Sequence, residues 1–330
     1  MKLTFLGTSA GVPTRHRNVT ALALQPEQVR SWILIDCGEG TQHRLLRCPL
    51  STTRLGLVLI THLHGDHCYG LPGLLASRTM TTLPREHQSL TLIGPKGLKG
   101  MLETIMHYSR LSLNFPLDII ELPDHGGEYD WYNHGIEAIP LKHNITSFAY
   151  CIREPAFPGP FDKSLAMADG IPEGPLYGQL KNKETVTLKD GRTVSGATYC
   201  LPETPGRTVI IGGDNKEPGL LQPCLQDCDL LVHEATYTEN IYRKLAVDVQ
   251  HSTAARVAQV CAATPLPNLI LTHFSPRYQA VSDGTSNRRS LEETRQEARR
   301  FFTGTLFLAN DFDTFLLART KVLSLHRQQR

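Results

Sequence analysis

Residues 57–67, LVLITHLHGDH, join an apolar run to a segment in which six positions hold three histidines and an aspartate. The apolar run predicts a buried β-strand. In an extended segment after it, His62 and His64 project from the same side, while the glycine that follows lets the chain turn so that Asp66 and His67 face a second point. Such a density of imidazoles rarely has a packing explanation, so one short loop is predicted to serve two metal ions.

Three further candidate ligands stand directly after other apolar runs: His143, Asp214 and His273. Imidazole and carboxylate ligands suit Zn²⁺, which takes three or more ligands from the protein, so the loop must recruit such distant residues. Any one of the three alone would more often cap a strand or belong to the core. Together with the histidine-rich loop they favour a metal centre at one edge of a sheet.

Short apolar runs that end in polar, glycine-containing loops predict buried strands. These runs lie at residues 3–6, 32–35, 57–60, 209–211, 230–232 and 269–271. Apolar residues at helical spacing predict helices between them, at residues 39–47, 97–108, 252–261 and 291–302. Strands that alternate with helices predict an α/β layered architecture. A chain of 330 residues fits one main domain, residues 1–330, that carries one insertion.

The segment 154–191 is predicted to be that insertion, because prolines and glycines recur in it with little apolar periodicity. It is either a functional arm or a disordered linker. Lys181 and Lys183, with Lys189 and Arg192, cluster in its second half. Such a cluster is able to track a sugar-phosphate backbone, and the alternative is a solvated linker.

Composition narrows the class of protein. No apolar run approaches the length of a membrane span, and the N-terminal residues 1–7 predict a first strand rather than a secretory signal. Eight cysteines at irregular spacings predict a reducing cytosol instead of a disulfide framework. Cys68 is interpreted as a small packed residue rather than a ligand. A formal net charge of +2 is too balanced to predict nucleic-acid binding by itself.

The candidate ligands, in their order along the chain, resemble the full ligand set of the metallo-β-lactamase superfamily. The resemblance implies a four-layer αββα sandwich with two Zn²⁺ ions per subunit. It assigns one zinc to His62, His64 and His143, the other to Asp66, His67 and His273, and a bridge between them to Asp214. Two Zn²⁺ offset by two carboxylates and a hydroxide leave a site of about +1, which suits a phosphodiester monoanion.

Four more segments are similar to ribonuclease Z in particular. They are Asp36-Cys37-Gly38-Glu39-Gly40-Thr41-Gln42, His233-Glu234-Ala235-Thr236, His251-Ser252-Thr253 and the residues 272–278, THFSPRY. The resemblance implies a zinc-dependent endoribonuclease that removes the 3′ trailer from precursor tRNA next to the discriminator nucleotide. The tRNA would keep a 3′-hydroxyl and the trailer a 5′-phosphate.

Three residues are expected to be catalytic. The family gives Asp66 the role of general base toward the attacking water. An imidazolium at His251 can protonate the departing oxygen, and Glu234 is suited to orient and charge it. On its own His251 would more often only begin a helix capped by Ser252 or Thr253, and the accompanying motif favours the catalytic interpretation.

Asp36 and Thr41 are candidate partners of the ligating histidines, because such histidines usually pass their second ring proton to an acceptor. A turn-forming aspartate is the competing interpretation of Asp36. Residues 13–18, PTRHRN, resemble the family's loop that senses the 3′ end of the substrate, which makes Arg15, Arg17 and Asn18 candidate substrate contacts. Arg15 replaces the family's lysine, and a guanidinium has another donor geometry. Arg277 could neutralise a flanking phosphate, or be a surface arginine.

The insertion contains Gly174-Pro175-Leu176-Tyr177-Gly178-Gln179-Leu180-Lys181. It resembles the glycine- and proline-rich tip with which ribonuclease Z grips tRNA, so Gly174, Pro175, Gly178, Lys181 and Lys183 are expected to contact substrate. The resemblance also implies a cytoplasmic homodimer without membrane attachment. The alternatives are another phosphodiesterase of the same superfamily and a non-catalytic RNA-binding relative.

Overall fold

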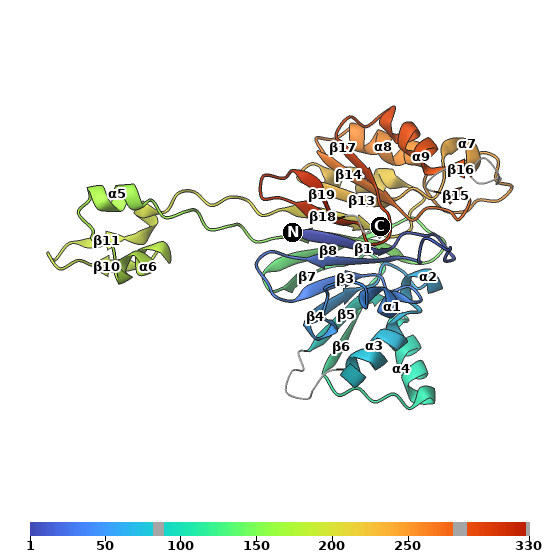
Figure 1. The fold of residues 1–330 in the computed structure, drawn as a ribbon, viewed down its shortest axis with the longest axis horizontal. Coiled ribbons are helices and arrows are strands. Elements are labelled where there is room, and N and C mark those ends of the chain that lie inside the picture. The colour runs from blue at the N-terminus through green and yellow to red at the C-terminus, as the bar shows by residue number, and fades with distance from the viewer. Residues whose placement is uncertain (82–88, 280–288, 328–330) are drawn as a thin grey trace. The chain divides into compact units, whose positions relative to one another are not determined.

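The computed structural model describes residues 1–81, 89–279 and 289–327, and the chain divides into two compact units. Unit 1 comprises Met1–Arg153 and Arg207–Arg330, and unit 2 is Glu154–Gly206. Unit 1 is built around two large sheets that lie against each other, with helices on their outer sides (Figure 1).

The first sheet has the strand order β19-β18-β1-β2-β3-β4-β5-β6. Its strands are β1 Lys2–Gly7, β2 Ala21–Gln25, β3 Trp32–Ile35, β4 Leu55–Leu59, β5 Leu90–Pro95, β6 Leu117–Leu122, β18 Thr314–Leu317 and β19 Leu323–Arg327. The strands from β3 to β6 run parallel, and the others pair antiparallel.

The second sheet has the order β17-β14-β13-β12-β9-β8-β7. Its strands are β7 Gly127–Trp131, β8 His134–Leu141, β9 Ser147–Arg153, β12 Thr208–Gly212, β13 Leu230–Glu234, β14 Asn268–Thr272 and β17 Thr305–Leu308. The strands β12, β13, β14 and β17 are parallel. Because β9 is antiparallel to both β8 and β12, β8 runs in the same direction as those four.

Alternate residues of the strands face different layers, as the two-residue period of a strand requires. Leu57 and Leu59 belong to the core between the sheets, together with Ile211 and Val232 of the second sheet. The next residue along, Val58, belongs to a second apolar cluster with the helices outside the first sheet. Burial of both faces explains why these strands are almost wholly apolar in sequence.

Helices complete the outer layers (Figure 1). The first sheet is covered by α1 Thr41–Leu45, α3 Leu71–Thr81 and α4 Leu98–Ser109, and the second by α8 Ala254–Ala262, α9 Leu291–Arg299 and the 3₁₀ helix Pro218–Leu225. The short helices α2 Gly65–Cys68 and α7 Glu239–Tyr242 and the pair β15 Tyr278–Gln279 and β16 Arg289–Ser290 lie in connections. The arrangement confirms the predicted four-layer α/β fold.

Unit 2 has secondary structure and an apolar cluster of its own. It contains α5 Lys163–Ala168, α6 Pro175–Lys181, β10 Thr185–Thr187, β11 Thr193–Ser195 and the 3₁₀ helix Gly196–Tyr199. The buried side chains of this cluster include Ala166, Leu180 and Tyr199. Isolated bridges between Phe157 and Thr204, and between Phe161 and Cys200, join its incoming and outgoing chains. The unit thus extends beyond residue 191, the end predicted for the insertion.

Within the described residues, no helix combines the length and apolar character that crossing a bilayer would require.

Candidate metal centre

The histidine-rich loop leaves the first sheet at the end of β4 and turns into α2. His62 is fully buried and His64 half-buried, in the extended backbone between these two elements. Asp66 and His67 follow in the first turn of α2, where the chain has changed direction. The loop therefore directs two pairs of candidate ligands to two neighbouring points.

The remaining candidate ligands come from the second sheet. His143 follows β8, Asp214 follows β12 and His273 follows β14, so all three leave parallel strands at their carboxyl ends. His273 has the left-handed backbone torsion φ 56°, which is uncommon for a residue with a side chain. Backbone in such a sparsely populated region is held by its surroundings and clusters at functional sites.

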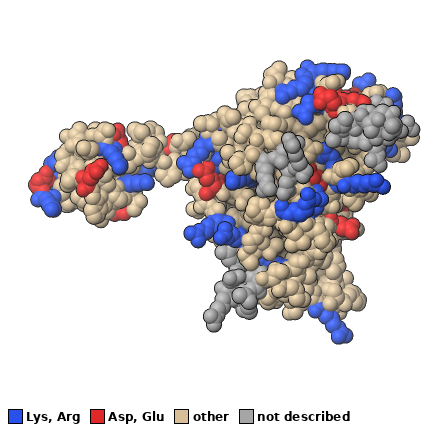
Figure 2. Space-filling view, viewed as in Figure 1, with Lys and Arg blue, Asp and Glu red and all other residues tan. Residues whose placement is uncertain are grey.

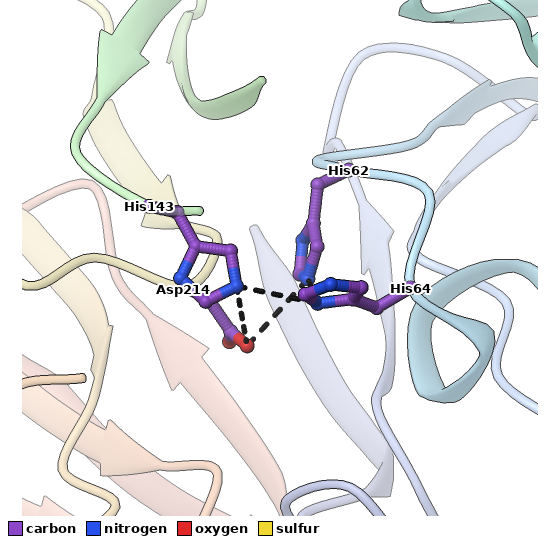
Figure 3. A group of neighbouring side chains, drawn as sticks. All are labelled: His62, His64, His143 and Asp214. Carbon is purple, nitrogen blue, oxygen red and sulfur yellow. Dashed lines mark hydrogen bonds and ion pairs between the residues drawn. The ribbon is translucent and has the colours of Figure 1, made fainter. Parts of the chain in front are cut away.

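The first group of ligand atoms is compact (Figure 3). Nδ1 of His64 lies 3.1 Å from Nε2 of His62 and 3.2 Å from Nε2 of His143. Oδ2 of Asp214 lies 3.5 Å from Nε2 of His62 and 3.9 Å from Nε2 of His143. A tetrahedral Zn²⁺ with bonds of about 2.0–2.1 Å separates its ligands by about 3.3 Å. These four atoms therefore fit the corners of a zinc site.

The second group shows the same spacing around another point. Nε2 of His67 lies 3.2 Å from Nε2 of His273, and both nitrogens lie 3.4 Å from Oδ2 of Asp66. Oδ1 of Asp214 lies 3.5 Å from Nε2 of His67 and 3.3 Å from Nε2 of His273. Asp214 thus presents one oxygen to each group, which is the geometry of a bridging carboxylate.

Asp214 also tests whether a cation fits here. Its Oδ1 is buried and has no hydrogen-bond partner among the described residues, although a buried charged oxygen without a partner is costly. The nearest atoms are imidazole nitrogens, which carry lone pairs when the rings are neutral. A metal ion between these atoms would remove the conflict, so the residues present fit a metal in both groups.

Hydrogen bonds behind the rings orient them. Nδ1 of His67 donates to Oδ2 of Asp36 at 2.7 Å, and Nδ1 of His62 lies 3.0 Å from Oγ1 of Thr61, which itself donates to Asp36 at 2.9 Å. With Nδ1 protonated, each Nε2 presents a lone pair to the ligand group. The carboxylate of Asp36 therefore supports one histidine of each group.

Two more rings are held in the same way. Nδ1 of His143 donates to the backbone oxygen of Gln250 at 3.0 Å, and Nδ1 of His273 lies 3.0 Å from Oγ1 of Thr236. Thr61 and Thr236 stand in the motifs quoted above, yet their role is not predictable from the sequence alone. The acceptor for His143 is the backbone oxygen of Gln250, which no pattern of side chains could indicate.

The protonation states of the histidines in the first group suit metal binding. Burial is the largest cause that lowers the pKa of His62, His64 and His143, so these rings are neutral ligands at neutral pH. Burial alone would raise the pKa of Asp66, but the neighbouring His67 and His273 outweigh it and lower that pKa. The aspartate is therefore anionic, as a metal-binding carboxylate must be.

Glu234 connects His251 to the same centre. The buried carboxylate accepts hydrogen bonds from Nδ1 of His251 at 3.1 Å and from the Thr236 hydroxyl at 2.5 Å, while Thr236 also contacts His273. Burial alone would lower the pKa of His251, but the carboxylates of Glu234 and Asp214 outweigh it and raise this pKa to about 9. His251 is therefore protonated at neutral pH.

His251 could also be considered a metal ligand, because it lies near Asp214 and His273. Its Nδ1, however, is 3.1 Å from Glu234 and 3.7 Å from Oδ2 of Asp214. The ring atom near Asp214 is thus the one that carries the proton donated to Glu234. The geometry favours an acid beside the metal centre over an additional ligand.

Two other residues that the sequence singled out, Thr41 and Arg17, lie outside the two groups of candidate ligands. Thr41 donates to the backbone oxygen of Gly38 at 2.7 Å, and none of its hydrogen bonds reaches a ligating histidine. Arg17 is buried and donates to Thr8, to the Ala309 backbone and to Asn310, at 2.5–2.8 Å. This guanidinium is committed to fixing its loop.

The remaining residues of that region differ in exposure. Asn18 donates through its side chain to the backbone of Glu39 at 2.8 Å. Arg15 and Arg277 are exposed, and the guanidinium carbon of Arg277 lies 5.8 Å from the ring centroid of Tyr237. These two arginines are accessible to a substrate phosphate.

The candidate contacts of unit 2 lie on or next to α6. Gly174 precedes the helix, Pro175 is its first residue, and Gly178 is exposed on it. Lys181 ends the helix, and Lys183 pairs with Glu203 at 2.5 Å. None of these residues belongs to the groups of candidate metal ligands.

Cys68 adjoins the ligand His67 without taking part in either group. Its buried thiol donates to the backbone oxygens of Leu63 and His64, at 3.5 and 3.3 Å. Burial raises the pKa of the Cys68 thiol to about 12. The side chain is therefore neutral and packed, as the sequence predicts.

Comparison with known proteins places this site in a family. The model of the family "Anti-Pycsar protein Apyc1" matches residues 1–164. Ribonuclease Z of Marinobacter nauticus is 42% identical over 329 residues, which cover 99% of each chain. The chain belongs to the ribonuclease Z family. This membership, predicted from the motifs, is confirmed.

Solved structures agree with that membership. Human tRNase Z, short form, has a TM-score of 0.64 at 27% identity, with 96% of this chain and 100% of that chain covered. The metallo-β-lactamase fold protein YhfI from Bacillus subtilis has a TM-score of 0.61 at 16% identity, with 95% and 98% covered. The second likeness confirms the fold alone. The chain belongs to the ribonuclease Z family and its residues fit a metal site, so it is a metal-dependent hydrolase.

Proposed function

We propose that this protein is a zinc-dependent endoribonuclease that cleaves the 3′ trailer from precursor tRNA next to the discriminator nucleotide. The observation that carries the proposal is the pair of tetrahedral ligand groups that share Asp214, with the protonated His251 beside them. The names of the relatives supply the substrate class, since they are ribonuclease Z and tRNase Z.

Seven residues would hold two Zn²⁺ ions: His62, His64 and His143 the first, Asp66, His67 and His273 the second, and Asp214 both. When bound, the ions supply Lewis-acid stabilisation and activate water for attack on phosphorus. The net charge of such a site suits a phosphodiester anion.

The chain's own groups would manage the protons. The carboxylate of Asp66, whose Oδ2 accepts a 2.7 Å hydrogen bond from the backbone N–H of Gly11, accepts the proton of the attacking water. Nε2 of His251 gives its proton to the departing 3′ oxygen of the tRNA. Glu234 keeps His251 protonated, and its Oε1 accepts a hydrogen bond from Nδ1 of His251 at 3.1 Å. The products are a 3′-hydroxyl on the tRNA and a 5′-phosphate on the trailer.

Unit 2 would bind the tRNA away from the scissile bond. It carries seven acidic and five basic residues, so its net charge is −2, and Figure 2 shows both signs interspersed on its visible face. Two of its cations are paired locally, Lys183 with Glu203 and Arg192 with Asp190. Lys181 and Lys189 are exposed and have no ion-pair partner among the described residues. Binding would therefore rely on these lysines and on the uncovered surface at Gly174 and Gly178, where an added Cβ would meet no other atom, rather than on overall charge.

The test uses a purified 3′-extended precursor tRNA and a small chromogenic phosphodiester. The wild-type protein should release the trailer with a 5′-phosphate, as end-labelling would show. A variant in which a short glycine linker replaces residues 154–206 should lose tRNA cleavage and keep hydrolysis of the small substrate. The linker is feasible because Arg153 and Thr208 are directly paired across β9 and β12.

Two outcomes would count against the proposal. Failure of the metal-loaded wild-type protein to cut the precursor would remove the tRNA assignment and favour another phosphodiesterase of the superfamily. Equal loss of both activities in the linker variant would argue that unit 2 serves the fold rather than the substrate. Failure of both ligand groups to bind Zn²⁺ would favour a non-catalytic RNA-binding relative.

We further propose a cytoplasmic homodimer. The cytoplasmic location rests on the tRNA substrate and on the cysteines, which are all unpaired. The dimer rests on the resemblance to the family, and sedimentation of the purified protein would test it.

A further inference from the structure

Tyr69 is an exposed aromatic residue directly beside the metal centre. Its side chain is 66% exposed; Tyr108 and Tyr132 are also exposed, whereas Tyr150, Tyr199 and Tyr278 are buried. Its hydroxyl makes no hydrogen bond to a described residue. A large ring left open to solvent next to a catalytic centre contributes little to folding. The position therefore calls for another explanation.

The backbone of Tyr69 is held firmly. Its N–H donates to the backbone oxygen of Gly65 at 3.0 Å, and the next residue, Gly70, donates to the backbone oxygen of Cys37 at 2.8 Å. A Cβ at Gly70 would lie 2.2 Å from the backbone oxygen of Gly38, so the two chain segments touch. The ring is thus presented by a rigid segment, which reduces the entropy lost when it binds something.

The ring of Tyr69 packs on the ligand loop. A Cβ at Gly65 would lie 2.4 and 2.5 Å from ring carbons Cε2 and Cδ2, so the ring lies directly over this glycine. Gly65 stands between two predicted ligands, His64 and Asp66. One part of the ring therefore contacts the metal loop while most of its surface is open.

A second exposed apolar side chain borders the same ligand. Gly11 donates through its N–H to Oδ2 of Asp66 at 2.7 Å, and the next residue, Val12, is 56% exposed. Arg15 of the same loop is exposed as well. Aromatic, apolar and cationic side chains together are typical of surfaces that bind single-stranded nucleic acid.

We propose that Tyr69 is a positioning residue that stacks on the base of a nucleotide flanking the scissile phosphate. This inference rests on the proposed endoribonuclease function. Every base has a π-face, so stacking holds single-stranded RNA without reading its sequence. A base fixed on a ring that lies over Gly65 would hold the neighbouring phosphate at the metal centre. No bond to Tyr69 forms or breaks in the reaction.

The first test compares Tyr69→Ala with Tyr69→Phe as its matched control. Stacking energies predict a fall of about 5- to 150-fold in kcat/KM on precursor tRNA for the alanine variant. The phenylalanine variant should retain nearly all activity. Both variants should keep wild-type zinc content and wild-type hydrolysis of a small phosphodiester that lacks a nucleobase, since neither change touches a ligand.

The second test removes the base instead of the ring. Precursors with an abasic nucleotide at the discriminator position, or at the first trailer position, are cut by the wild-type and Tyr69→Ala proteins. At the stacked position the two losses should not add, because each change removes the same contact. Full additivity at both positions, or equal kcat/KM for Tyr69→Ala and wild type, would overturn the inference. If the wild-type protein fails to cut the intact precursor, the proposed function fails instead.

Discussion

Replacing Asp36 with asparagine should weaken metal binding in both ligand groups. The carboxylate accepts hydrogen bonds from the N–H and hydroxyl of Thr61 at 2.8 and 2.9 Å and from Nδ1 of His67 at 2.7 Å. Asparagine has the same size and tolerates the left-handed torsion, φ 58°, found at this position. Its amide nitrogen is a donor, however, and takes the place of one accepting oxygen.

The size of the loss in metal affinity depends on which hydrogen-bond donor loses its acceptor in the Asp36→Asn variant. If the asparagine oxygen keeps the Thr61 N–H, the Nδ1 proton of His67 faces a donor and the ring is no longer held. Loss of such an outer partner weakens metal affinity about 10- to 100-fold, which corresponds to about 1.4–2.7 kcal/mol. Because Thr61 in turn holds His62 at 3.0 Å, the loss should reach both groups.

Competition with a chelator, followed by calorimetry, would measure the affinities, and elemental analysis would count the ions. Thr41→Val is the matched control, since Thr41 lies in the motif that follows Asp36 and donates to the backbone of Gly38 rather than to a histidine. That variant should lose some stability and no zinc affinity. Wild-type affinity in Asp36→Asn, or an equal loss in Thr41→Val, would refute the role assigned to the carboxylate.

Three further expectations concern catalysis and stability. His251→Ala should keep its metal ions but lose about 10²- to 10⁴-fold in single-turnover cleavage, and loss of metal would make His251 a ligand instead. Turnover should fall as the pH rises through about 9, because the imidazole of His251 then has no proton to give. Burial alone would lower the pKa of His251, but Glu234 and then Asp214 outweigh it and raise this pKa to about 9. Glu234→Gln should move this fall to lower pH, and an unshifted pH profile would contradict the pairing. Arg17→Ala should lower the free energy of unfolding, measured by urea denaturation, by about 3 kcal/mol, whereas Arg15→Ala should leave it unchanged. Similar free energies for the two variants would show that burial of the Arg17 guanidinium is unimportant.

The buried strands were predictable because burial of both faces leaves a continuous apolar run. The strands β3, β4 and β14 all lie at or within about two residues of the predicted ranges. The candidate ligands after them could be singled out for the same reason, since a polar residue at the end of such a run stands out. Strands of mixed polarity, such as β6 and β7, gave no comparable signal.

Two parts of the site were beyond sequence reasoning. Thr61 and Thr41 both belong to conspicuous motifs, and only the tertiary structure shows that Thr61 contacts a ligating histidine while Thr41 does not. Gln250, whose carbonyl accepts the hydrogen bond from His143, adopts φ 54°, a backbone state that its side chain does not encode. Orientation of the ligands thus depends on distant backbone as much as on motifs.

The apolar cluster of unit 2 was not predictable from apolar periodicity. Prolines and glycines interrupt every run long enough to show a period, and the buried residues Ala166, Leu180 and Val186 are brought together by turns. The antiparallel pairing of Thr187 with Thr193 is one such closure. Periodicity is a weak guide wherever elements are only three to seven residues long.

The pairing of Arg153 with Thr208 has a consequence for how the protein melts. Because the chain leaves and re-enters the second sheet at adjacent strands, none of that sheet's hydrogen-bonded ladder passes through unit 2. A unit with so small an apolar cluster opens at a lower free-energy cost than the sandwich. Heating should therefore produce an early, partial transition during which the metal ions stay bound.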